Sequence, residues 1–398
     1  MNTLTSNLEH FVPAGKKRKG IGLSLSGGGF RATLFHLGAL RRLNELGTLK
    51  RFRTISSVSG GSIINGFLAT RLTPPLAGGI GNFERDVSAP LRAFCSLDIR
   101  RWPALERFVP GLDNSEHLAH QYEEHLTNNK LLRDIPIAPI HVFCSTDLAF
   151  GVNWMFKKLE CGDYQAGFQK TPADWKVSTA VAASSCFPPV FKPMALNLDP
   201  TRFKRGQAKP DTVRNAVIRK ITFSDGGVYD NLGLEPIWKD HEFVLCSDGG
   251  ALFSTGGDAG FAWEIGRFIT IPENQALALR KRWLIASFIA KQMKGTYWGI
   301  GGTAAEYTFK QGYSQDLIKY FIASIRTDLD GFSEAEASVL ENHGYWLADA
   351  AIRKHLPELL PAKVPALQVP HPDWDERDED KIKKALANSA HRTILGRI

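Results

Sequence analysis

Two successive units constrain most strongly how this sequence can fold. Each consists of an apolar segment, a glycine-rich turn and an amphipathic segment. The first unit runs from Ile21 to Ser26, through three consecutive glycines, into residues 30–46, where leucines recur at helical spacing. The second runs through residues 52–58 and Ser59-Gly60-Gly61 into a helix over residues 62–71. Because parallel strands need helical crossovers, this order predicts an α/β fold with a mainly parallel sheet.

The rest of the chain divides by composition into a core with additions. We expect a flexible basic N-terminal arm at 1–19, a catalytic core at 20–260, and a mainly helical C-terminal extension at 261–398 packed on the core. A Pro/Gly-rich stretch opens a helical insertion or cap at 72–135. Further strands are predicted at 140–144, 218–223 and 243–246, and a further helix near 176–183.

Composition narrows the classes of partner. The formal net charge is +8, which favours anionic partners such as a phospholipid surface or nucleic acid. Basic residues interleaved with aromatic ones, as nucleic-acid binding requires, are not evident, so we expect no nucleic-acid partner. The cluster at 16–19 and the basic amphipathic stretch at 280–293 are candidates for peripheral membrane contact, although each also fits an ordinary protein surface or a packed helix.

The expected cellular compartment rests on two features, the lack of certain apolar segments and the pattern of cysteines. The N-terminus has no apolar secretory segment, and no run of about 18 apolar residues predicts a membrane span. The five cysteines form no CxxC pair and no even framework, so we expect free thiols in a reducing compartment. We therefore expect a cytoplasmic protein with possible peripheral membrane association.

Ser59 is the candidate nucleophile because it stands at the turn between the second strand and its helix. A serine hydroxyl needs an exposed position on a sharp turn and a nearby base. Ser57, Gly60 and Gly61 are small enough for such a turn, in an S-x-S-x-G pattern that departs from G-x-S-x-G at its first position. The segment also fits a plain βα turn in which Ser59 caps the helix, so by itself it leaves both interpretations open.

The glycine-rich turn of the first unit is the candidate oxyanion hole. Backbone N–H groups of Gly27, Gly28 and Gly29, with that of Gly60, can converge on one point at a helix N-terminus, where the oxyanion of acyl transfer would develop. Arg31 follows directly and is a candidate for binding the substrate or its anionic head group, or else an ion-paired arginine.

A dinucleotide site is a competing interpretation of the same loop. The pattern Gly27-x-Gly29-x-x-Ala32 fits such a loop loosely. A dinucleotide site also needs an acidic residue at the end of the next strand to hold a ribose, and that strand ends in Ser57-Val58-Ser59.

Two aspartates are candidates for the base. Asp225 and Asp248 each follow a predicted strand and each precede two glycines. Aspartate is a weak base at its usual pKa of about 3.9, and desolvation beside a serine hydroxyl would raise that pKa. On chemistry alone the two are nearly equivalent, and each also fits a turn aspartate.

Together and in this order, three motifs resemble those of the patatin-like phospholipase family. They are the Gly27–Arg31 loop, the Ser57–Gly61 turn and the Asp225–Asn231 segment, and the resemblance covers roughly residues 20–250. It implies a three-layer α/β/α sandwich, with a helical insertion and a helical C-terminal extension here. It further implies a Ser59/Asp225 dyad without histidine, an oxyanion hole at the three glycines, and no metal or cofactor. It also favours Asp225 over Asp248.

The implied activity is hydrolysis of carboxylic esters in phospholipids or other acyl lipids, of phospholipase A or lysophospholipase type. Residues 183–191 and 140–147 resemble further family segments. Ser57, where the family usually has glycine, and Ser26, where plant patatins have aspartate, put the subfamily in question rather than the chemistry. Some bacterial relatives await a partner or small signal, so a regulatory ligand or partner acting through 72–135 or 261–398 is a further expectation.

Other chemistries stay open at this stage. A Ser–Asp–His esterase would need a histidine after the acid, such as His343 or His355, and a non-catalytic lipid sensor could retain the same fold. His117, His120 and Glu124 are spaced as a metal site on one helix face would be, but such a face is more often solvated, and we expect no metal. Asp328-Leu329-Asp330-Gly331 lacks the later ligands of a calcium loop.

Overall fold

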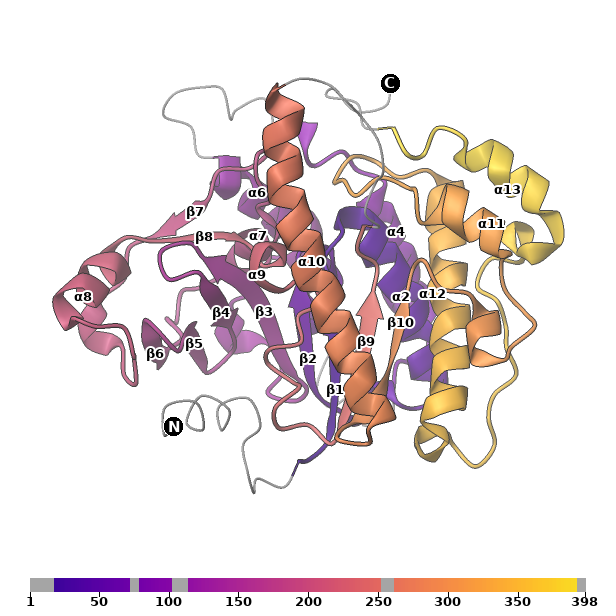
Figure 1. The fold of residues 1–398 in the computed structure, drawn as a ribbon, viewed down its shortest axis with the longest axis horizontal. Helices are drawn as coiled ribbons and strands as arrows, with labels where there is room; N and C mark the ends of the chain where they lie inside the picture. Colours follow the sequence, from indigo (N-terminus) through magenta and orange to yellow (C-terminus); the bar gives the residue numbers. More distant parts are fainter. Residues whose placement is uncertain (1–17, 72–78, 102–113, 252–260, 392–398) are drawn as a thin grey trace.

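The structure is a computed structural model that describes residues 18–71, 79–101, 114–251 and 261–391. Within these ranges the chain forms one ten-stranded sheet with helices on both faces (Figure 1). The strands are β1 (Ile21–Leu25), β2 (Phe52–Val58), β3 (Ile140–Asp147), β4 (Val152–Phe156), β5 (Glu160–Asp163), β6 (Gly167–Lys170), β7 (Met194–Leu196), β8 (Ile221–Asp225), β9 (Phe243–Asp248) and β10 (Lys294–Gly299). The helices include α2 (Gly29–Glu45), α3 (Gly60–Arg71), α4 (Ala89–Cys95), α6 (Asn114–Tyr122), α7 (Val177–Ser185), α8 (Asp211–Arg219), α9 (Gly227–Asp230), α10 (Phe261–Ile289), α11 (Gln315–Leu317), α12 (Glu334–His355) and α13 (Glu379–Leu386).

The strands β10, β9, β1, β2 and β3 lie side by side in that order, and each neighbouring pair is parallel. The prediction of an α/β fold around a mainly parallel sheet is therefore confirmed. Strands β4, β5 and β6 continue the sheet in antiparallel pairing. Every residue of β1 is buried, as expected for a parallel strand covered by helices on both faces.

The register on β3 brings the ends of two distant strands together. Strand β2 pairs with the first part of β3, where Val58 lies opposite Cys144. Strand β8 pairs with the last part of β3, where Asp225 lies opposite Ser145. Because β4 occupies the other edge of β3 over the same residues, β2 and β8 share one edge. The end of β8 therefore meets the end of β2.

The C-terminal extension belongs to the core. Strand β10, which the sequence analysis did not predict, extends the central sheet by pairing with β9. Helix α12 packs along α2 so closely that a Cβ at Gly38 would lie 1.8 Å from the backbone oxygen of Glu341. Arg42 of α2 forms a buried ion pair with Asp349 of α12, with Nε and Oδ1 2.7 Å apart. On the opposite face, α10 buries Leu284 with Val244 and Cys246 of β9.

The predicted additions are described only in part. Residues 1–17 of the basic arm and residues 72–78 and 102–113 of the insertion lie outside the described residues. The described part of this segment contains α4 and α6. No helix among the described residues is long and apolar enough to cross a membrane.

Candidate active site

Ser59 occupies the turn between β2 and α3 with a left-handed backbone, φ 49°. Non-glycine residues seldom adopt this conformation, and it is typical of a nucleophile presented on a strained strand-to-helix turn. The turn is held by Ser184 at the end of α7. The Ser59 N–H donates to both the backbone oxygen of Ser184 (3.1 Å) and its Oγ (3.0 Å).

The glycines around Ser59 are required by close backbone packing. A Cβ at Gly60 would lie 2.1 Å from the oxygen of Gly29, and one at Gly61 would lie 2.3 Å from the oxygen of Leu25. A Cβ at Gly27 would lie 3.1 Å from the Cβ of Ser59. The two predicted glycine turns are therefore in direct contact, and the N-termini of α2 and α3 lie together beside Ser59.

Asp225 ends β8 next to this turn, and its side chain is 2% exposed. Its Oδ1 accepts a hydrogen bond from the Gly227 N–H at 2.7 Å. Its Oδ2 is buried and has no hydrogen-bond partner at bonding distance in the described part of the chain. The Ser59 hydroxyl is near enough to the carboxylate to lower the pKa of Asp225. The pair is thus adjacent without a closed hydrogen bond, as is common in enzymes without substrate.

The pKa of Asp225 suits a base. Burial raises this pKa to about 7, although the hydrogen bond from the Gly227 N–H and the nearby Ser59 hydroxyl lower it, while the charge of Glu273 on α10 raises it. A carboxyl group with a pKa near neutrality can take a proton from a hydroxyl and return it later in the reaction.

Asp248, the other candidate base, lies in a different environment. Burial would raise the pKa of Asp248, but Lys281, Tyr297 and the Gly250 N–H together hold it below its ordinary value. Its Oδ2 lies 2.5 Å from the Nζ of Lys281 and accepts a hydrogen bond from the Tyr297 hydroxyl at 2.7 Å. It ends β9, and β1 separates β9 from β2. The tertiary structure therefore distinguishes two aspartates that the sequence chemistry did not.

Three backbone N–H groups beside Ser59 have no acceptor among the described residues: those of Gly28, Gly29 and Gly60. The N–H of Gly27, predicted to be a fourth donor, instead donates to the oxygen of Asn231 at 3.0 Å. Gly27 therefore packs closely against Ser59 and Asn231, and its N–H is already engaged by the Asn231 oxygen. The three remaining groups lie at helix N-termini, whose positive potential suits an oxyanion.

A family model for patatin-like phospholipases matches residues 23–238, more than half of the chain. The match contains the glycine loop, Ser59 and Asp225. The chain belongs to the patatin-like phospholipase family.

Solved structures related to this patatin-like chain are distant. Human GIVD cytosolic phospholipase A2 bound to methyl gamma-linolenyl fluorophosphonate is 12% identical, with a TM-score of 0.48, 89% of this chain covered and 61% of that chain covered. Another structure of the human enzyme is 11% identical, with a TM-score of 0.37, 58% of this chain covered and 46% of that chain covered. VipD from Legionella pneumophila is 13% identical, with a TM-score of 0.37 and coverages of 85% and 67%. No curated protein matches the sequence.

Arg31 differs from its predicted role in substrate or anion binding. Its side chain is buried, and its guanidinium donates to the backbone oxygens of Gly249, Ala323 and Ile325 at distances of 2.7–3.2 Å. The adjacent Phe30 N–H donates to the oxygen of Asp328 at 2.9 Å. The C-terminal part of this patatin-like chain therefore braces the glycine loop through Arg31 and Phe30.

Ser184 and Asn231 also lie at the candidate site, and the sequence predicted no role for either of them there. The oxygen of Ser184 also accepts the Gly226 N–H at 3.1 Å, so this residue holds both the Ser59 turn and the Asp225 turn. A Cβ at Gly27 would lie 2.3 Å from Oδ1 of Asn231, and one at Gly227 would lie 2.7 Å from it. The only sequence signal for either was membership of segments that resemble the family.

The two histidines considered for a Ser–Asp–His triad form hydrogen bonds with other residues. His343 of α12 bonds the oxygen of Ile300 through Nε2 at 2.8 Å, and burial lowers its pKa to about 4. His355 bonds Thr296 through Nδ1 at 2.8 Å. Neither position supports a Ser59–Asp225–His arrangement.

The possible metal sites are also explained by other contacts. His120 and Glu124 are exposed, with Nδ1 and Oε2 3.9 Å apart. Asp328 pairs with Arg100, and Asp330 pairs with Arg326. No group of three or more metal-binding side chains is placed to hold an ion in the described ranges.

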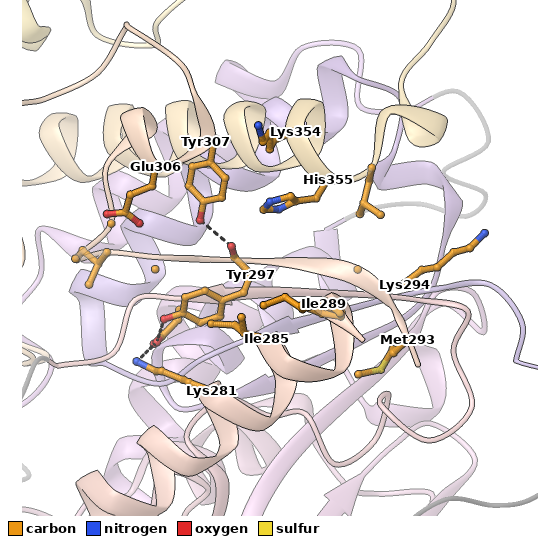
Figure 2. Close-up of a pocket in the computed structure, with 18 of the residues that line it drawn as sticks. Lys281, Ile285, Ile289, Met293, Lys294, Tyr297, Glu306, Tyr307, Lys354 and His355 are labelled. Carbon is orange, nitrogen blue, oxygen red and sulfur yellow. Dashed lines mark hydrogen bonds and ion pairs between the residues drawn. The ribbon is translucent and has the colours of Figure 1, made fainter. Parts of the chain in front are cut away.

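A cavity of about 990 Å³ lies between α10, β10 and the end of α12 (Figure 2). Its lining includes Lys281, Ile285 and Tyr297, and it reaches Asp248 and Gly250 but neither Ser59 nor Asp225. Figure 2 shows Lys281 beside Tyr297, and the Nζ of Lys281 lies 2.5 Å from Oδ2 of Asp248. This cavity is therefore distinct from the dyad, and Asp248 forms part of its wall.

Removal of the Ser184 hydroxyl tests whether it positions Ser59. Ser184→Ala removes the hydrogen bond from Oγ to the Cys144 oxygen (2.6 Å) and the Oγ acceptor for Ser59 N–H. We expect kcat for ester hydrolysis to fall about tenfold, with KM little changed, because misplacement of a nucleophile costs rate rather than binding. Ser178→Ala on the same helix is the matched control, since its buried Oγ has no partner among the described residues. Equal kcat in the two variants would contradict a positioning role.

Replacement of Arg31 distinguishes a role in bracing the glycine loop from a role in binding an anion. Arg31→Met leaves buried backbone oxygens without a hydrogen-bond donor. Each unsatisfied oxygen destabilises the fold by about 1–3 kcal/mol, so we expect a clearly lower midpoint of thermal unfolding. The exposed Arg219→Met on α8 is the control and should leave the midpoint unchanged. An unchanged midpoint together with a raised KM for anionic substrates alone would instead restore the anion-binding role.

Proposed function

We propose that this chain is a lipid acyl hydrolase of phospholipase A or lysophospholipase type that works through a Ser59 acyl-enzyme. The single observation that supports this proposal most is the strand register on β3. It brings Asp225, a buried carboxyl group with a pKa near 7, beside the strained turn that carries Ser59. Membership of the patatin-like family supports a lipid ester as the substrate.

In the first half of the reaction, Asp225 takes the hydroxyl proton of Ser59 as Oγ attacks the ester carbonyl carbon. The carbonyl oxygen becomes an oxyanion, and the N–H groups of Gly28, Gly29 and Gly60 donate to it. Each such donor is worth about 3 kcal/mol in the transition state. The C–O bond to the alcohol then breaks, and Asp225 returns the proton to the departing lysolipid or glycerol oxygen.

In the second half, water hydrolyses the acyl-enzyme. Asp225 takes a proton from water, the resulting hydroxide attacks the acyl carbon, and the same N–H groups stabilise the second oxyanion. The bond to Ser59 Oγ breaks, Oγ regains the proton from Asp225, and a fatty acid leaves. No histidine is needed, because the raised pKa of Asp225 lets one group act as both base and acid.

Substitution of the dyad tests the chemistry. Ser59→Ala and Asp225→Asn should each lower hydrolysis of a short p-nitrophenyl ester and of mixed-chain phosphatidylcholine by at least about 10³-fold. Asp248→Asn is the matched control. It should retain the reaction while losing stability, because it leaves Lys281 without its buried partner.

Three results would overturn all or part of this assignment. Activity that survives Ser59→Ala would remove Ser59 as the nucleophile. Retained activity in Asp225→Asn together with loss in a folded Asp248→Asn would move the base to Asp248. A wild-type chain that binds lipid but hydrolyses none of these esters would instead indicate a non-catalytic sensor.

The pH dependence tests the base independently of loss of activity. Asp225 must be ionised to accept the proton, so kcat/KM for a neutral ester should rise with pH and level off, with a midpoint at about 7. The negative charge of Glu273 raises the pKa of Asp225, so Glu273→Gln should move the midpoint to lower pH. The exposed Glu124→Gln is the control and should not move it. If Asp248 were the base, its lowered pKa would place the midpoint in the acid range instead.

A further inference from the structure

Helix α10 is poorly covered by the rest of the protein. Among residues 267–289 with described side chains, only Leu284 and Ser287 are buried. Large apolar side chains are exposed instead: Phe268 is 74% exposed, Leu279 59% and Ile289 77%. Scattered exposed apolar residues are ordinary, but a contiguous row on one helix marks an interaction surface.

The exposed residues form one face. Phe268, Pro272, Leu279, Ala286 and Ile289 are spaced by four, seven, seven and three residues, so at 3.6 residues per turn they line one side of the helix. We call this face, with its neighbours, the outer stripe. The neighbours are Ile271, Gln275, Ala276, Arg282, Trp283 and Ala290. The outer stripe is about 32 Å long from Phe268 to Ile289 at the usual helical rise, and only Gln275 and Arg282 on it are polar.

Basic side chains border the outer stripe. The side chains of Arg282 and Lys291 are exposed and have no ion-pair partner in the part of the chain that the structure describes. Lys294 is also exposed, and its Nζ lies 3.8 Å from Oε1 of Glu242 and 5.1 Å from the centre of the Phe243 ring. A long apolar face with exposed cations beside it fits the boundary between acyl chains and anionic head groups. Trp283 is of the residue type enriched at that boundary.

Helix α10 runs beside the segment that follows the candidate base. On the inner side of α10, Arg280 donates to the oxygen of Tyr229 at 3.3 Å and lies 3.7 Å from the Asp230 carboxylate. Both residues belong to α9, which begins two residues after Asp225. Figure 1 shows α10 running in front of the sheet and past α9. A surface that received the outer stripe would therefore lie across α10 from the segment that follows Asp225.

We propose that the outer stripe of α10 docks this protein on an anionic phospholipid surface. The apolar side chains enter the head-group boundary, and Arg282, Lys291 and Lys294 contact lipid phosphates. The proposal deepens the proposed function, because a lipid substrate would be taken from the same surface. Docking itself does not require hydrolysis, so the two can fail separately.

Vesicle binding by the full chain tests the proposal. The Ser59→Ala chain is used so that vesicles stay intact, and it is sedimented with vesicles of phosphatidylcholine alone or with about 30 mol% phosphatidylglycerol. We expect binding to the anionic vesicles and a fall of at least about tenfold in the partition coefficient for Leu279→Gln/Ile289→Gln. Leu159→Gln, at an exposed apolar position in the turn between β4 and β5, is the matched control and should bind as the parent does.

Two further measurements separate docking from chemistry and from self-association. In a chain with native Ser59, the double variant should keep hydrolysis of a soluble short-chain ester and lose hydrolysis of anionic vesicles. All five native cysteines are buried, so Leu279→Cys can be labelled selectively with an environment-sensitive fluorophore, whose emission should shift to the blue on anionic vesicles.

Three outcomes would overturn the proposal. They are the absence of binding to anionic vesicles, undiminished binding by the double variant, and a concentration-dependent dimer that the double variant abolishes while vesicle binding is absent. The last result would assign the outer stripe to a second copy of the chain. Ester hydrolysis that survives Ser59→Ala would overturn the proposed chemistry and leave the docking result standing.

Discussion

The pairing of β2 and β8 with one edge of β3 is the constraint on which the candidate site depends. Val58 and Asp225 lie opposite consecutive residues of β3, so the strand after which Ser59 turns and the strand that ends in Asp225 meet end to end. Hydrogen bonds along β3 fix how the two strand ends meet. The distance between the Ser59 and Asp225 side chains can therefore vary little. Ser184 strengthens it by accepting N–H groups from both turns.

The same arrangement imposes an energetic cost on the fold. Asp225 has an ordinary pKa near 4 when exposed and about 7 in the folded protein. A raised pKa means that the folded state holds the proton more tightly than the unfolded state. The cost is therefore absent at low pH, grows as pH rises from about 4 to 7, and is fully present above 7. Deep packing offsets this cost, including the buried contact of α2 with α12.

The C-terminal part of the chain gives the glycine loop its shape. Arg31 and Phe30 donate to backbone oxygens between Ala323 and Asp328, while β10 completes the parallel part of the sheet. A region that extends past the matched family segment thus contributes to the candidate active site. It also carries α10, whose inner side contacts the segment after Asp225 and whose outer side is left uncovered.

The sequence by itself determined the local elements. Strand–glycine–helix units predicted β1, α2, β2 and α3 closely, because hydrophobic period and glycine turns act over short stretches of chain. It also named Ser59 and two aspartates, but it placed Arg31 at the substrate and missed β10. Only the tertiary structure separated Asp225 from Asp248 on physical grounds. Strand neighbours, burial and the Lys281 ion pair are contacts between distant segments, and no local pattern encodes them.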